Sequence, residues 1–193
     1  MGKTLEESFV AYKQLFDEAN VGKELEEIVD VNELLKTPAA PSLDTGLAFD
    51  GSVIYLTNMM WYFAEKIMSF YGAVYRNVNP ISLKKVIVLH QLGKVGMFTP
   101  NTDDWQVKKL GKVYTFAETG VCLKTGERSK MVCGNAGVVF TPEEYEAMTI
   151  LDKTAEEYEN MTKFRTHLST IIKMSSDLAY AAARERAKNT NNE

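Results

Sequence analysis

The sequence predicts a mainly α-helical protein with one inserted β-hairpin. Apolar residues recur about every three to four positions through most of the chain, which is the spacing of a helix with one buried face. Only one segment, residues 105–116, alternates apolar and polar side chains and is rich in residues that favour strands. With 193 residues the chain fits one domain of ordinary size. We therefore expect a single globular unit, in which N-terminal helices and a connector (residues 1–49) precede a helical core (residues 50–193).

The N-terminal part begins with two predicted helices and a proline-containing connector. Thr4 is followed three residues later by Glu7, the pattern of a capping box, which predicts a helix start. A second short helix is expected over about residues 23–35. Pro38 and Pro41 then indicate an extended connector, because each proline lacks a backbone donor and keeps the preceding residue out of the α region.

The long central helix is predicted to start at residues 50–52 and to carry an apolar stripe at helical spacing. The members of this stripe are Val53, Leu56, Met60, Phe63 and Ile67. Residues 77–80 predict a turn into the next helix, over residues 81–92, which should end at Gly93.

The C-terminal half starts with the hairpin, whose strands at 105–110 and 112–116 are joined at Gly111. Helical patterning returns at residues 128–135. A further helix starts at Thr141, which is followed by Pro142 and, three residues after the threonine, by Glu144. The last long helix is expected from about Thr166.

Composition and charge exclude several function classes. A formal net charge of −4 gives the chain no general attraction to nucleic acid or to anionic membranes. The most apolar run, residues 53–75, contains Glu65 and Lys66 near its middle, so it predicts a core helix and not a membrane span. The first 18 residues have no apolar secretory segment, so we do not expect secretion. Cys122 and Cys133 lack the spacing of a metal or redox motif and are expected to be reduced thiols.

Residues 86–96 read VIVLHQLGKVG, residues 124–129 read KTGERS and residues 176–181 read SDLAYA, and a helix is expected to start near residue 50. These four segments resemble segments of the HD superfamily of metal-dependent phosphohydrolases and follow the same order as in that family. Residues 86–96 are similar to the family's apolar helix that ends in His-Asp before a Leu-Gly-Lys-like turn. The helix that starts near residue 50 matches the one that carries the family's first His. Residues 124–129 are similar to a His-Gly-Glu-Lys/Arg-Ser-like turn, and residues 176–181 to the context of the last Asp. The resemblance spans roughly residues 50–183 and implies an HD-like helical bundle.

The resemblance also implies which ligand positions have changed. In the family, adjacent imidazole and carboxylate groups hold divalent cations that activate water against a phosphate ester. Here the residues at the positions of the site are Leu56, His90, Gln91, Thr125 and Asp177. Only His90 and Asp177 keep a ligand type, and two such ligands do not normally hold a divalent ion at catalytic occupancy. We therefore expect no metal, no cofactor and no catalysis at this site.

Two further expectations concern the side chains around this set. A buried His90 should hydrogen-bond to Asp177 or to the backbone. Lys94 and the turn at residues 127–129 would contact phosphate or orient ligands in an active relative, and here should mainly stabilise turns.

The functional expectation is a non-catalytic HD-like protein that serves as a binding or structural component. Gln after His, the Gly-Glu-Arg-Ser turn and residues 140–148 are similar to degenerate HD-like proteins of tailed bacteriophages. This similarity implies a phage-encoded protein, located in the virion or in the host cytoplasm. Two alternatives remain open: an active nucleotide phosphohydrolase with a rearranged metal site, and a nucleotide-binding module that uses Lys94 and Arg128 without catalysis.

A protein partner is expected at aromatic and methionine side chains that one core cannot bury together. Tryptophan and tyrosine are over-represented where binding energy concentrates in interfaces. The candidate binding surface consists of Met59, Trp61, Tyr62, Trp105, Tyr114 and Phe116. It would place the chain in an oligomer or a larger assembly. The alternative is that the hairpin and the central helix pack on each other.

Overall fold

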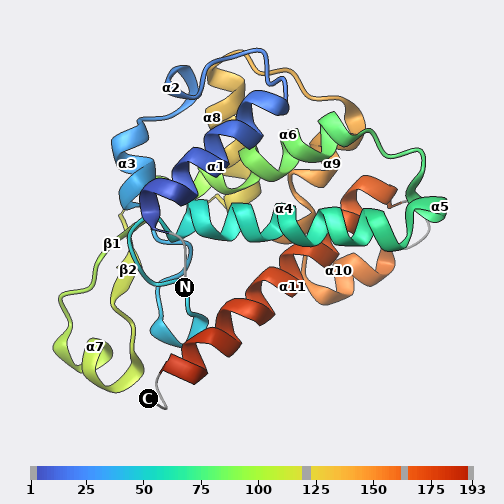
Figure 1. Cartoon of the computed structure of the whole chain (residues 1–193). Helices are drawn as coiled ribbons and strands as arrows, with labels where there is room; N and C mark the ends of the chain where they lie inside the picture. The colour runs from blue at the N-terminus through green and yellow to red at the C-terminus, as the bar shows by residue number, and fades with distance from the viewer. Residues whose placement is uncertain (1–3, 119–122, 162–164, 191–193) are drawn as a thin grey trace.

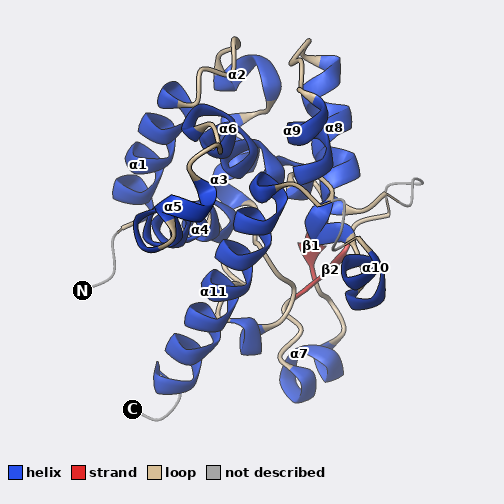
Figure 2. Cartoon of the chain, turned by 90° about the vertical axis from the view of Figure 1, so that its right-hand side faces the viewer, coloured by secondary structure: helices blue, strands red, loops and turns tan. Residues whose placement is uncertain are grey.

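The computed structural model describes residues 4–118, 123–161 and 165–190, and it confirms a mainly α-helical fold with one two-stranded sheet among them (Figure 1). The longer helices are α1 (Leu5–Glu18), α4 (Ser52–Phe70), α6 (Pro80–His90), α8 (Thr125–Asn135) and α11 (His167–Thr190). The shorter elements are α2 (Leu25–Ile28), α3 (Val31–Lys36), α5 (Gly72–Tyr75), α7 (Asp104–Leu110), α9 (Pro142–Ala147), α10 (Ala155–Asn160), the 3-10 turns η1 (Leu43–Thr45), η2 (Gln91–Lys94) and η3 (Ile150–Asp152), and the strands β1 (Phe98–Pro100) and β2 (Tyr114–Phe116). Figure 2 shows how small the sheet is beside the helices.

Helix α4 is the centre of the core. It packs against α1, α6 and α11, and in Figure 1 it crosses the molecule between α1 and α11. Its apolar side chains point to more than one neighbour, so Val53, Ile54, Leu56 and Met60 are each at most 1% exposed. Because residues on several faces of α4 are buried, packing in the core accounts for its apolar run. No helix in the described part of the chain is both long and apolar enough to span a bilayer.

The start of α1 has the predicted capping box. The backbone N–H of Glu7 donates to the Thr4 hydroxyl at 3.1 Å, and the Thr4 N–H donates to the Glu7 carboxylate at 2.8 Å. About two turns into α1, the Tyr12 hydroxyl donates to the Val88 carbonyl at 3.1 Å and connects α1 to α6. Burial raises the pKa of Tyr12, so this phenol stays neutral and keeps its donor.

The prediction of one helix over residues 23–35 is wrong, because the segment forms two short helices. α2 ends before Val29, whose backbone is extended. The Asp30 carboxylate then accepts a hydrogen bond from the Asn32 N–H at 2.8 Å and starts α3. An aspartate in this position is a strong N-cap, and an N-cap residue has a non-helical backbone. A single helix therefore cannot run through Asp30.

The position of the first hairpin strand is also wrong, although the sheet exists. Residues 104–110 form α7, and β2 pairs with β1 in antiparallel register, Phe98 opposite Phe116. The Asp103 carboxylate accepts from the N–H groups of Trp105 and Gln106, and Gly111 ends the helix with φ 62°. These two caps stabilise a helix in a segment whose alternation alone suggested a strand.

Helix α10 has no counterpart in the sequence prediction, although Thr154 and Glu157 form a capping box of the same type as the one at Thr4.

The described cysteine is a buried, free thiol. Burial raises the pKa of Cys133 to about 12, so this thiol stays protonated. The other cysteine, Cys122, lies outside the described residues.

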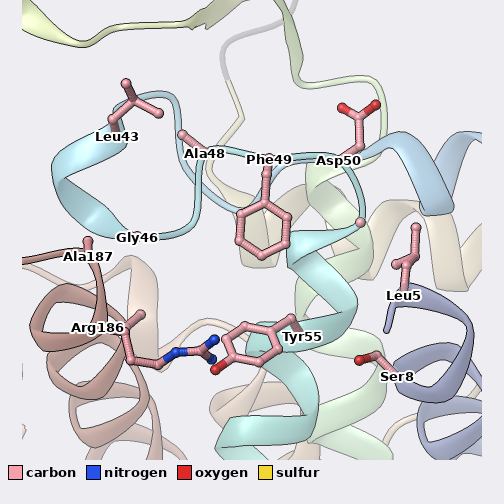
Figure 3. A pocket seen from close by; sticks show the side chains of 12 residues that line it. Leu5, Ser8, Leu43, Gly46, Ala48, Phe49, Asp50, Tyr55, Arg186 and Ala187 are labelled. Carbon is pink, nitrogen blue, oxygen red and sulfur yellow. The ribbon is translucent and has the colours of Figure 1, made fainter. Parts of the chain in front are cut away.

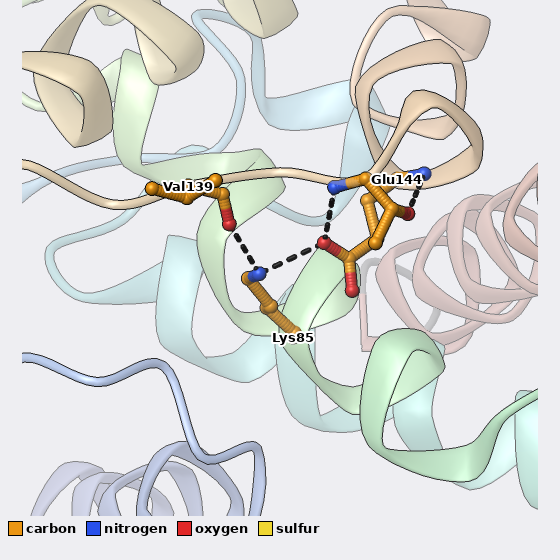
Figure 4. A network of polar contacts seen from close by, with 4 residues as sticks. Lys85, Val139 and Glu144 are labelled. Carbon is orange, nitrogen blue, oxygen red and sulfur yellow. Dashed lines mark hydrogen bonds and ion pairs between the residues drawn. The ribbon is translucent and has the colours of Figure 1, made fainter.

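A buried ion pair fixes α9 against α6. The Lys85 ammonium donates to Glu144 at 2.8 Å and to the Val139 carbonyl at 2.6 Å, while the Thr141 N–H donates to the same Glu144 carboxylate at 3.0 Å (Figure 4). The side chains of Lys85 and Glu144 are only 12% and 4% exposed. Burial opposes the ionised carboxylate, but the hydrogen bonds from Lys85 and Thr141 outweigh it and hold the pKa of Glu144 below its ordinary value.

Candidate functional site

The central motif forms a turn that packs directly on α8. α6 ends at His90, and residues 91–94 continue as the 3-10 turn η2. The Gly93 N–H donates to the Ser129 hydroxyl at 2.7 Å, and that hydroxyl donates to the His90 carbonyl at 2.6 Å. Arg128 donates to the carbonyls of Gly93 and Val95 at 2.7 and 3.1 Å. Two of the four segments that carry the family resemblance, residues 86–96 and 124–129, are therefore hydrogen-bonded to each other.

Two glycines allow this close packing. A Cβ atom on Gly93 would lie 2.1 Å from the Thr125 carbonyl oxygen, and a Cβ on Gly126 would lie 2.0 Å from the Met148 carbonyl oxygen. Backbone atoms cannot yield to such an approach as a flexible side chain can, so glycine is required at both positions. The Asp152 carboxylate fills the remaining space and accepts from the Gly126 N–H at 2.9 Å.

Five of the six predicted residues of the degenerate site meet at one cavity, which we call the polar pocket. Its volume is about 250 Å³. It is lined by His90, Gln91, Lys94, Thr125, Leu151, Asp152, Lys153, Lys173, Ser176, Asp177 and Tyr180. The sixth residue, Leu56, does not line the pocket and is 0% exposed in the core.

His90 does not pair with Asp177, which corrects the sequence prediction. The Asp177 carboxylate accepts two hydrogen bonds from Lys173, one turn earlier on α11, and 62% of its side chain is exposed. A lysine on the same helix face reaches the carboxylate while Asp177 stays largely in water, whereas a bond to the buried histidine would require its desolvation. The prediction of a backbone bond for the His90 ring is also wrong, since its one partner within the described part of the chain is the Gln91 side chain.

The His90 imidazole is neutral and half satisfied. Its Nδ1 lies 3.1 Å from Nε2 of Gln91, and its Nε2 is buried without a hydrogen-bond partner among the described residues. Burial, and to a smaller extent the charge of Lys94, lowers the pKa of His90 to about 3. The ring therefore carries one proton at physiological pH.

Lys94 is a buried cation that has only neutral partners. Its ammonium donates to the Ala39 carbonyl at 2.5 Å and to the Tyr180 hydroxyl at 2.9 Å, and the residue is 7% exposed. None of the ion pairs among the described residues includes Lys94. Lys94 joins the proline-containing connector to α11, but its charge is not neutralised there. Arg128, the other residue expected to contact phosphate, already donates to the carbonyls of Gly93 and Val95.

The donor set of the polar pocket differs from that of a divalent-cation site. Across residues 4–118, 123–161 and 165–190, no group of three or more His, Cys, Asp or Glu side chains lies close enough to share a metal ion. The positions between His90 and Asp177 hold a neutral amide, Gln91, and a hydroxyl, Thr125. The pocket also holds two carboxylates, but Asp152 already accepts from the Gly126 N–H and Asp177 from Lys173, and its ammonium groups and neutral donors bind anions better than cations.

A second, larger cavity was missed by the sequence analysis; we call it the apolar pocket. Its volume of about 630 Å³ falls in the range of small-ligand sites. Figure 3 shows the rings of Phe49 and Tyr55 in the middle of the pocket's lining, with Leu43 and Leu5 on opposite sides of them. The guanidinium carbon of Arg186 lies 4.9 Å from the centre of the Tyr55 ring. The segments that meet here, α1, η1, the start of α4 and the end of α11, are far apart in sequence, so no local pattern indicates the pocket.

The candidate binding surface divides into two regions. Met59 and Trp61 on α4 are half-buried against the core, and the Lys84 ammonium lies 5.2 Å from the Trp61 ring. Tyr62 is 54% exposed, and further along α4 Phe70 is 84% exposed, a residue that the sequence analysis did not select. One core does not bury residues 59–62 together, as their spacing indicated.

The second region lies on α7 and β2. Trp105 and Phe116 are 61% and 67% exposed, whereas Tyr114 is half-buried and donates to Asp50 at 2.8 Å. Figure 1 places α7 and the strands at one end of the molecule, away from the C-terminal half of α4. The exposed members therefore lie in two separate regions of the surface.

Comparisons with protein-family models, with curated proteins and with solved structures find no match.

Proposed function

We propose that this chain is a non-catalytic protein with a degenerate HD-like core, which acts as a protein-binding or structural component. One observation carries the proposal: Gln91 and Thr125, a neutral amide and a hydroxyl, line the polar pocket beside His90, while Leu56 is part of the core. Among the described residues no three His, Cys, Asp or Glu side chains lie close enough to share a metal ion, whereas divalent-metal hydrolysis needs such a set of ligands. The similarity to phage-encoded proteins extends the proposal to a component of a virion.

Elemental analysis and a turnover assay test the non-catalytic part. We expect less than stoichiometric Mn, Mg, Fe or Zn in the protein after incubation with each ion, because only two ligand-type side chains of the set remain. Hydrolysis of nucleoside mono- and triphosphates should be no faster than in buffer. Stoichiometric metal, together with turnover that EDTA and His90→Ala both abolish, would establish the alternative of a hydrolase with a rearranged site.

The partner-binding part depends on the exposed aromatic side chains of α7 and β2. Replacing Trp105 and Phe116 together with Ser should abolish assembly or partner binding, since exposed aromatic side chains supply much of the energy of interfaces. The thermal midpoint should change little, because both side chains are more than half exposed. Co-purification of native assemblies and sedimentation velocity measure the first effect, and circular dichroism measures the second.

Val10→Ser is the matched control, because Val10 is 67% exposed on α1, outside the candidate surface. It should leave assembly intact. If the double variant unfolds instead, the hairpin belongs to the core. If it folds and still assembles, the partner binds elsewhere.

A further inference from the structure

The polar pocket contains a positive charge that no residue of the described chain neutralises. Lys94 is 7% exposed, and the two partners of its ammonium are a carbonyl and a hydroxyl. A buried cation without a counter-charge is costly, and an anion in the adjoining cavity would remove that cost. The pocket's two carboxylates are already engaged. Asp177 binds Lys173, and Asp152 accepts the backbone N–H of Gly126.

A second group in the pocket offers an unused donor. The Gln91 amide nitrogen lies 3.1 Å from His90 Nδ1 and 3.6 Å from the Met60 sulfur. A thioether sulfur only accepts hydrogen bonds, so the atom that faces it is the NH2 group. That NH2 group also donates to Nδ1, which leaves the single imidazole proton on Nε2. Nε2–H of His90 is buried and has no partner among the described residues.

A third group is an unused acceptor. With its NH2 group directed to His90 and Met60, Gln91 has its Oε1 atom free of any partner in the described chain, although the residue is only 2% exposed. Buried polar atoms are nearly always hydrogen-bonded, so two unpartnered atoms on neighbouring residues that line one cavity indicate a missing partner. That partner must supply an acceptor for Lys94 and His90 and a donor for Gln91.

We propose that the polar pocket binds, without a metal, a small oxyanion that also carries a hydrogen-bond donor. Monohydrogen phosphate and 2-hydroxycarboxylates both have this chemistry. The anionic oxygens accept from Lys94 and from Nε2–H of His90, and the O–H group of the ligand donates to Oε1 of Gln91. This ligand goes beyond the proposed protein-binding role, from which it takes only that no metal fills the pocket.

Two pairs of anions that differ mainly in the donor test the proposal. The full chain is titrated by calorimetry with phosphate and sulfate, and with glycolate and acetate, at neutral pH in EDTA and at constant ionic strength. Phosphate and glycolate carry an O–H group near neutral pH, whereas sulfate and acetate do not. We expect the donor-bearing member of at least one pair to bind at least about tenfold more tightly than its counterpart. The pair that shows this preference distinguishes a phosphate from a carboxylate ligand.

Variants assign each part of the recognition. Lys94→Met should weaken binding of the preferred anion by at least about tenfold, since it removes the charge-assisted bond. Gln91→Leu should reduce the preference for the donor-bearing anion towards one. Lys108→Met is the matched control, because Lys108 is 71% exposed on α7 and lies outside the pocket, and it should leave affinity unchanged.

Wild-type NMR keeps the test independent of whether these variants fold. The sequence has two histidines, His90 and the exposed His167. The preferred anion should shift the His90 ring resonances and leave those of His167 in place. The proposal is overturned if the members of each pair bind equally, if His90 does not respond, or if Lys108→Met weakens binding as much as Lys94→Met. Metal-dependent turnover in the assay of the preceding section would overturn the non-catalytic role, a separate result, because these titrations contain EDTA.

Discussion

Leu56→Ala is expected to lower the free energy of unfolding by about 2–5 kcal/mol. Leu56 is 0% exposed in the middle of the core formed by α4 and its neighbours. Removing its side chain loses apolar burial and leaves a cavity that the surrounding helices can only partly fill. Urea unfolding followed by circular dichroism measures the change.

Leu178→Ala provides the matched control for this prediction. It deletes the same atoms from a helix, but Leu178 on α11 is 44% exposed, so the cost should stay below about 1 kcal/mol. A loss that small at Leu56 would contradict the buried position. The residue would then face open space, and the degenerate site would extend to α4, which corresponds to the helix with the first histidine in the HD superfamily.

Lys85→Met is expected to destabilise the protein by about 3–5 kcal/mol. The Glu144 carboxylate is 4% exposed and would lose the ammonium that lies 2.8 Å away, so a buried negative charge would remain without its cationic partner (Figure 4). Lys85 also donates to the Val139 carbonyl, which would lose that partner. Urea unfolding at neutral pH measures the effect.

The double variant Lys85→Met/Glu144→Leu is the control for an uncompensated charge. Replacing both partners by apolar side chains should recover most of the loss, because a buried ion pair contributes little compared with well-packed apolar groups. A double variant as unstable as Lys85→Met would contradict this explanation and assign the effect to packing on α6.

Acid titration of the same pair provides an independent measurement. The folded-state pKa of Glu144 is held below its ordinary value, so the stabilisation is fully present above the unfolded pKa of about 4.3 and is lost as the pH falls through the folded pKa. The wild type should therefore lose more stability on acidification than Glu144→Gln does. Equal slopes for the two proteins would show that Glu144 is not held in its ionised form.

Local sequence signals determined the helices that carry their own caps. Thr4 with Glu7, and Thr141 with Glu144, start helices because a side chain and the backbone satisfy each other within four residues, a contact that does not depend on the rest of the fold. The same reasoning applied at Asp103 and Gly111 would have replaced the predicted strand by α7. Alternation was the weaker signal there, because a strand also requires a partner, and β1 lies outside the segment that showed the pattern.

The sequence by itself also indicated five of the eleven residues that line the polar pocket. His90, Gln91, Lys94, Thr125 and Asp177 were selected from separate segments, and all of them line it. Only the tertiary structure decided what these groups do there. Asp177 bonds to Lys173 at the surface, Lys94 is buried between Ala39 and Tyr180, and the N–H group of His90 has no partner among the residues that the structure describes. The physical reason is that burial and hydrogen-bond partners depend on how elements distant in sequence pack together, and sequence patterns report only on the face of each element.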